Sequence, residues 1–126
     1  MRILLAHLVG DYVIQSDWMA SHKTQRWWPA ILHAVTYGLS YLLVTRSVPA
    51  LAVIISTHAV IDRYRLARYL VFAKNFLAPR KSWPRWTECS VTGYPKDRLE
   101  WLAVWLMIIA DNTVHLAINW TSVVWL

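Results

Sequence analysis

The stretch "LLAHLVGDYVIQ", residues 4–15, is largely apolar and yet carries His7 and Asp11, four positions apart. Residues at this spacing lie on the same face of an α-helix. In an apolar or membrane environment a charged side chain is costly, and it normally faces a partner or a water-filled cavity. The fold and the chemistry of this chain therefore both depend on what these two side chains meet.

The same spacing of histidine and aspartate occurs twice more. "HAVID" holds His58 and Asp62, and "DNTVH" holds Asp111 and His115 in the reverse order. With 5 histidines and 7 acidic residues among 126, about 0.6 such pairs are expected by chance, whereas three are present. A further histidine, His33, lies near the start of another apolar segment.

The composition favours a membrane protein. Hydrophobic residues make up 57% of the chain, and charged residues only 16%, against about 25% in a typical soluble domain. The mean hydropathy is +0.33, and the chain holds nine tryptophans, a residue that gathers where an apolar region meets water. The alternative is a bundle of buried helices in a soluble protein. The only cysteine, Cys89, excludes an internal disulfide.

Four apolar segments predict helices, and a spanning helix needs about 20 apolar residues. We therefore expect an all-α fold, a polytopic transmembrane bundle of about four helices in one domain, 1–126. The expected helices cover about 2–21, 29–45, 49–73 and 98–126, with a basic loop at 74–97. Nine of the 13 Lys and Arg residues lie between Arg63 and Arg98, which indicates a cytoplasmic loop. With four crossings of a bacterial inner membrane, both termini would be periplasmic.

Histidines and aspartates on facing helices predict a metal site, because helix bundles build such sites from pairs at this spacing. This donor set suits Zn, Mn, Fe or Ni, and it is large enough for one or two ions. We expect a divalent transition metal, zinc first. The alternative is a set of hydrogen-bonded structural pairs or a proton relay. The expected ligands are His7, Asp11, His33, His58, Asp62, Asp111 and His115.

Further polar residues lie close to these ligands in the sequence. Gln15, Tyr37 and Asn112 are expected to orient the ligands by hydrogen bonds. Arg63 and Arg65 are expected near an anionic headgroup or phosphate. The alternative for these arginines is an anchor on the cytoplasmic side of the membrane.

The motifs "LLAHLVGDYVIQSDWMA", "LHAVTY", "STHAVID" and "ADNTVH", in this order, resemble those of small membrane proteins of bacteria and phages grouped as domain of unknown function 3307. The likeness covers most of the chain except the basic loop. The family's last motif usually has Gln after the Asp, where this chain has Asn112. A more distant similarity is to bacterial inner-membrane metal-dependent hydrolases, which also carry His and Asp on hydrophobic helices. The first resemblance implies a membrane location and no particular activity.

We expect metal-assisted hydrolysis of a lipid or a lipid-linked phosphate or ester, with Asp11 or Asp111 as the general base. A second class is transport of metal ions or protons, which would need a homo-oligomer. A third is a phage protein that acts on the host membrane, such as a holin-like lysis protein or an exclusion factor. The chain has no P-loop, GxSxG or CxxC motif. Nucleic acid is not expected as a partner, since only the net charge of +6 favours it.

Overall fold

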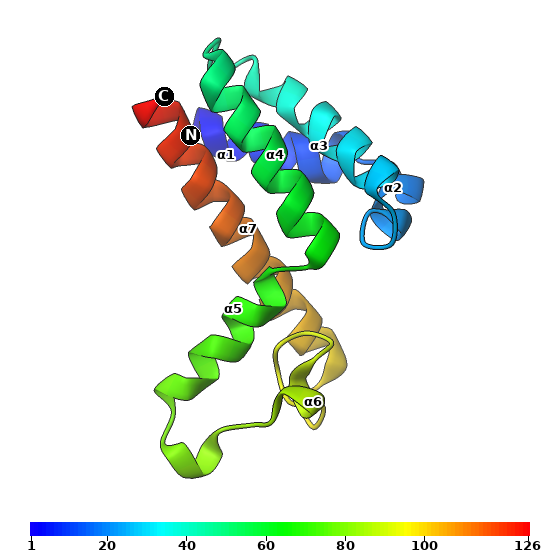
Figure 1. The fold of residues 1–126 in the computed structure, drawn as a ribbon, viewed down its shortest axis with the longest axis vertical. Coiled ribbons are helices and arrows are strands. Elements are labelled where there is room, and N and C mark those ends of the chain that lie inside the picture. The colour runs from blue at the N-terminus through cyan, green and yellow to red at the C-terminus, as the bar shows by residue number, and fades with distance from the viewer. The chain divides into compact units, whose positions relative to one another are not determined.

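The structure, a computed structural model, describes residues 1–126 and consists of helices joined by turns and loops, without a β-strand (Figure 1). The all-α prediction is confirmed. The elements in chain order are α1 (Arg2–Leu8), the π-helix η1 (Val9–Ile14), α2 (Asp17–His22), α3 (Trp27–Tyr41), α4 (Val48–Tyr64), α5 (Ala67–Lys74), the 3-10 turns η2 (Asn75–Leu77) and η3 (Arg80–Ser82), α6 (Trp86–Cys89) and α7 (Glu100–Trp125).

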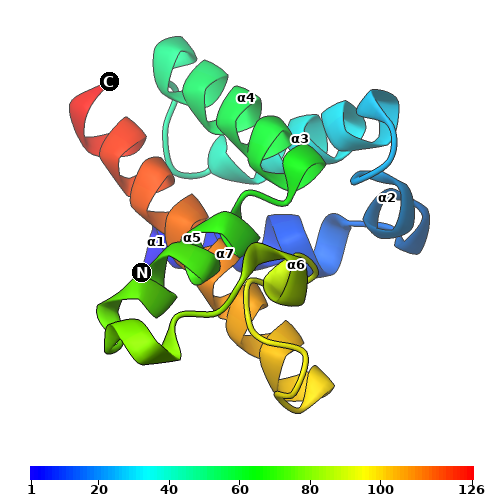
Figure 2. The same ribbon diagram turned by 60° about the horizontal axis from the view of Figure 1, so that its bottom comes forward.

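The chain forms two compact units. The first comprises Met1–Arg65 and His115–Leu126, and the second comprises Leu66–Val114. The first unit therefore contains α1 to α4 and the C-terminal part of α7, and the second contains α5, α6 and the N-terminal part of α7 (Figures 1 and 2).

The prediction of a bundle with four membrane spans is wrong. One helix, α7, is long and apolar enough to cross a membrane. The helix next in length, α4, has 17 residues, which at ~1.5 Å per residue reach about 26 Å, less than the ~30 Å of a bilayer's hydrocarbon core. The prediction that both termini are periplasmic assumed four crossings of the membrane, so it has lost its basis.

The first expected helix, over 2–21, is interrupted in its second half. From Val9 the backbone changes from α-helix to π-helix, and Gln15 is extended. Ser16 then caps α2, because its side chain accepts a hydrogen bond from the backbone N–H of Met19 at 3.3 Å. A polar run without glycine or proline therefore ends one helix and starts the next.

The third expected helix, over 49–73, is divided at Arg65. Its first part, α4, begins after Ser47, whose side chain accepts from the backbone N–H of Ala50 at 3.4 Å. It ends at Arg65, which adopts the left-handed conformation with φ 51°. Such a conformation is uncommon for a residue other than glycine, so the sequence pattern did not reveal it.

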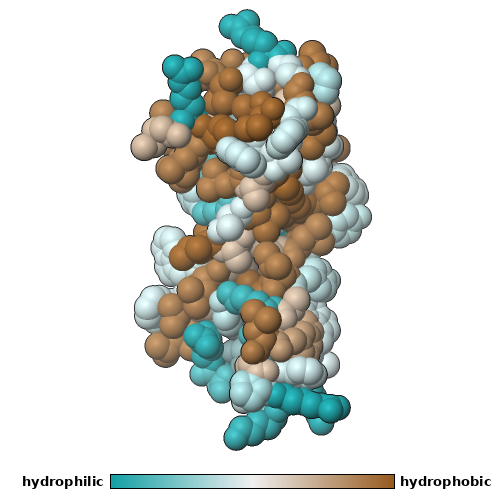
Figure 3. Space-filling model, turned by 90° about the vertical axis from the view of Figure 1, so that its left-hand side faces the viewer, coloured by the Kyte–Doolittle hydropathy of each residue, from teal (hydrophilic) through white to brown (hydrophobic).

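The first unit packs around a small apolar core and keeps an apolar surface. The core consists of Ala6, Tyr37, Tyr41 and Ile54. Large apolar side chains also remain exposed on its helices, for example Leu43 at 86%. The face drawn in Figure 3 is largely hydrophobic. Exposed apolar area of this kind marks a surface for contact with lipid or protein.

Candidate metal centre

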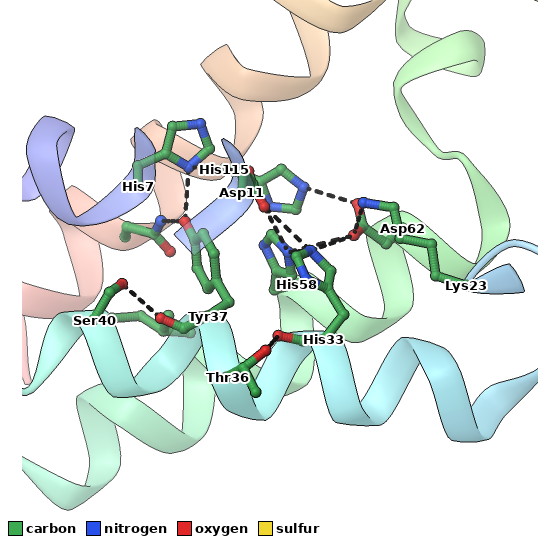
Figure 4. A network of polar contacts seen from close by, with 12 residues as sticks. His7, Asp11, Lys23, His33, Thr36, Tyr37, Ser40, His58, Asp62 and His115 are labelled. Carbon is green, nitrogen blue, oxygen red and sulfur yellow. Dashed lines mark hydrogen bonds and ion pairs between the residues drawn. The ribbon is translucent and has the colours of Figure 1, made fainter. Parts of the chain in front are cut away.

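Two histidines and two aspartates from three elements of the first unit meet at one point (Figure 4). The Nε2 atom of His58 lies 2.9 Å from Nε2 of His33 and 3.3 Å from both Oδ1 of Asp11 and Oδ2 of Asp62. The Nε2 atom of His33 lies 3.2 Å from Oδ1 of Asp11 and 3.3 Å from Oδ2 of Asp62. Each of the two nitrogens therefore contacts the same two carboxylate groups.

Hydrogen bonds alone do not account for this crowding. An imidazole Nε2 carries either one hydrogen or one lone pair, so it can make a single hydrogen bond although it has three polar neighbours here. Ligand atoms at 2.0–2.1 Å around a tetrahedral zinc ion are about 3.3 Å apart. The contacts of 2.9–3.3 Å in this cluster match that spacing. The donor set therefore fits a divalent ion.

Two groups of three side chains could hold an ion, and both are buried in large part. One is formed by Asp11, His33 and His58, and the other by His58, Asp62 and His115, with the ligand atoms of each group within 4.8 Å of one another. In the second group, Nε2 of His115 lies 3.4 Å from Oδ1 of Asp62. His58 belongs to both groups and is the centre of the cluster.

Both carboxyl groups are in the form that binds metal. Burial raises the pKa of Asp62, but its hydrogen bonds with His115 and His33 outweigh burial and hold the pKa well below its usual value. Burial opposes ionisation of Asp11 as well, and hydrogen bonds with His33 and His58 likewise hold its pKa below the usual value. Both side chains are therefore ionised at neutral pH, as metal ligands must be.

Lys23 reaches the same cluster from the turn after α2. Its Nζ atom donates to Oδ2 of Asp62 at 2.7 Å. With its amide oriented so that both ends find partners, Gln15 accepts from Lys23 Nζ at 3.0 Å and donates to the backbone oxygen of Asp11 at 2.9 Å. Sequence reasoning missed Lys23, because a lysine in a polar turn gives no sign of a contact 39 residues away.

Asp11 lies within the π-helix η1. Single turns of π-helix are rare and often occur at functional sites, where they change the direction of a side chain. Oδ1 of Asp11 faces His33 and His58, while its Oδ2 lies 3.4 Å from Nδ1 of His7. One carboxylate therefore joins the histidine of α1 to those of α3 and α4.

A buried network of hydrogen bonds lies next to the cluster and contacts two of its histidines. The hydroxyl of Tyr37 lies 2.8 Å from Nδ1 of His7, and its ring stacks on His58 with the ring centroids 3.7 Å apart. Nδ2 of Asn119 donates to the hydroxyls of Tyr37 and Tyr41 at 2.5 and 2.7 Å. Sequence reasoning missed Asn119, although it lies four residues after His115 and so shares its helix face.

Replacing Tyr41 by phenylalanine is expected to lower the free energy of unfolding by about 1 kcal/mol. The change removes the hydroxyl that donates to the backbone oxygen of Ile3 at 3.2 Å and accepts from Asn119. Chemical denaturation of both proteins measures the difference. Metal content should stay unchanged, because Tyr41 contacts none of the proposed ligands. A loss of metal would contradict the inference that Tyr41 stabilises the fold without holding a metal ligand.

The other predicted site residues lie outside these two groups. Asp111 and Asn112 are part-buried residues of α7 that belong to the second unit, and their roles stay predictions. Nη1 of Arg63 donates to the backbone oxygen of Thr24 at 2.7 Å. Arg65 forms the C-cap of α4. The binding of a headgroup by these two arginines also stays a prediction.

The comparisons with known proteins give one result. No curated protein and no solved structure matches the chain. A family model described as a protein of unknown function, DUF3307, matches residues 1–125. Since this match covers nearly the whole chain, including every residue of the cluster, the protein belongs to the DUF3307 family.

Proposed function

We propose that this protein is a metal-dependent hydrolase that acts on a lipid or a lipid-linked phosphate or ester at a bacterial membrane. The observation that carries the proposal is the crowding at His58, whose Nε2 lies 2.9–3.3 Å from one nitrogen and two carboxylate oxygens. Zinc is the ion we propose, because it accepts mixed nitrogen and oxygen ligands at this spacing.

A bound divalent ion would polarise the ester or phosphoryl oxygen and lower the pKa of the attacking water. Asp11 is the proposed general base, because its side chain is 10% exposed whereas that of Asp62 is 4% exposed. It would accept the proton of the water. The water oxygen then bonds to phosphorus or to the acyl carbon, the bond to the leaving oxygen breaks, and the proton passes to that oxygen. Asp111, the other predicted base, stays a candidate.

An apolar substrate is supported by two features of the chain. Helix α7 is long and apolar enough to cross a membrane. The first unit also has a groove of about 500 Å³. The groove is lined by Arg2, Leu5, Ala6, Val9, Ile14, Leu39, Ser40, Leu43 and Val44. An almost wholly apolar lining suits an acyl chain.

Removal and return of the metal test the proposal. Protein purified in detergent without chelator is expected to contain stoichiometric metal and to hydrolyse a short-chain phospholipid in the absence of any ion gradient. Treatment with chelator should abolish this turnover, and added zinc should restore it. Turnover that needs no metal would contradict the proposal. Protein without metal would make the histidine–aspartate pairs structural.

A further inference from the structure

Lys23 is a cationic side chain in direct contact with the cluster, and nothing in the metal-site prediction accounts for it. Its Nζ lies 2.7 Å from Oδ2 of Asp62, and its side chain is 19% exposed. The histidine rings at the centre are almost fully buried. The edge at which the cluster reaches solvent is therefore formed by Lys23 and by Asp11, which is 10% exposed.

The position of Lys23 is held by its surroundings. Gln15 accepts from its ammonium at 3.0 Å. Arg63 of α4 binds the backbone oxygen of the next residue, Thr24, at 2.7 Å. A cation that is already in place loses little conformational freedom when it binds an anion.

The balance of charge favours one ion over two. Asp11 and Asp62 supply two negative charges, and Lys23 supplies one positive charge. One divalent ion would leave the cluster with a single positive charge, whereas two would leave three in a largely buried place, which is costly without further anions. His58 also belongs to both groups of ligands, and its Nε2 has one lone pair to offer.

We propose that the centre holds one divalent ion and that Lys23 supplies a second cationic group beside it, so that together they bind the anionic oxygens of a phosphoryl group. The inference rests on the proposed metal-dependent function and narrows its substrate from esters in general to phosphoryl compounds. An ammonium next to a metal ion stabilises an oxyanion and adds little for a neutral ester. The phosphoryl group would enter at the edge formed by Lys23 and Asp11.

Titration of cobalt-loaded protein tests this inference, because the visible spectrum of cobalt reports on its ligands. Wild type is expected to bind one equivalent of cobalt, and inorganic phosphate should change the spectrum. Lys23→Met should weaken phosphate binding by about 10-fold or more and keep the metal. Lys23→Arg, which keeps the charge, should bind phosphate within about threefold of wild type. Lys81→Met removes an exposed lysine of the second unit and serves as the matched control.

A parallel titration with a short-chain phosphatidic acid identifies the source of the phosphoryl group. Tighter binding than that of inorganic phosphate would assign the site to a lipid headgroup, and equal binding would assign it to a free phosphate group. Either result supports the binding of a phosphoryl group by the metal ion and Lys23, provided that Lys23→Met weakens that binding.

The inference is overturned if wild type binds two equivalents of cobalt, if phosphate leaves its spectrum unchanged, or if Lys23→Met binds phosphate as wild type does. The first two outcomes are measured on wild type alone. The inference can therefore be overturned even if Lys23→Met does not fold. Absence of bound cobalt would overturn the metal site as well. Phosphate binding that depends on Lys23, without any turnover, would overturn only the proposed hydrolysis.

Discussion

Replacing His58 by glutamine is expected to lower the affinity for zinc by more than about 100-fold. Loss of a residue that merely orients a ligand costs 10–100-fold, and His58 is placed as a ligand in both groups of the cluster. Its Nε2 is the atom that contacts Asp11, His33 and Asp62. Glutamine keeps much of the side-chain volume, so the substitution mainly tests the loss of the imidazole ligand and disturbs the packing little.

Metal content by mass spectrometry and thermal unfolding measure this effect. Zinc at 100 times the dissociation constant of wild type should stabilise wild type by about 2.7 kcal/mol and His58→Gln by less than about 0.4 kcal/mol. His22→Gln is the matched control, because His22 belongs to neither group of ligands and its Nδ1 contacts the backbone oxygen of Trp18 at 2.8 Å. Full metal content in the His58 variant would mean that the ion binds elsewhere.

Replacing Gly10 by alanine is expected to destabilise the protein by about 1–2 kcal/mol and to weaken metal binding about 10-fold. A Cβ atom at Gly10 would lie 2.4 Å from Cδ2 of Tyr37. The Tyr37 ring is fully buried and stacked on His58, so it cannot move without shifting a proposed ligand. Overpacking of this kind costs about 1–3 kcal/mol, more than the gain of up to about 1 kcal/mol from alanine in a helix.

Gly38→Ala provides the control for this prediction. A Cβ atom there would also meet a side chain at 2.4 Å, namely Cγ1 of Ile55. Ile55 is part-buried, but its Cγ1 is held by the restricted χ1 of a β-branched residue in a helix, so this substitution is also expected to lower stability in denaturant unfolding. Because Ile55 is not one of the proposed ligands, we expect no loss of metal. Equal losses of metal in the two variants would show that the Tyr37 ring is not the rigid support we infer.

The sequence alone determined what depends on local periodicity. Histidine and aspartate four residues apart share a helix face wherever a helix forms, so spacing is enough to identify the pairs His7–Asp11 and His58–Asp62. The all-α class follows from the same local pattern. The breaks at Gln15 and Arg65 could not be found in this way, because neither glycine nor proline marks them. Continuous helices, and with them four membrane spans, were therefore expected where the chain has shorter pieces.

Only the tertiary structure decided which pairs meet. The contact of His33 with His58 joins α3 to α4 across 25 residues, and the contact of Lys23 with Asp62 spans 39. Such distances depend on how the helices pack, and no spacing in the sequence encodes them. The same holds for Asn119, whose amide contacts Tyr37 across 82 residues. The sequence supplied the candidate ligands, and the packing of α3 against both α4 and η1 brought them within reach of one ion.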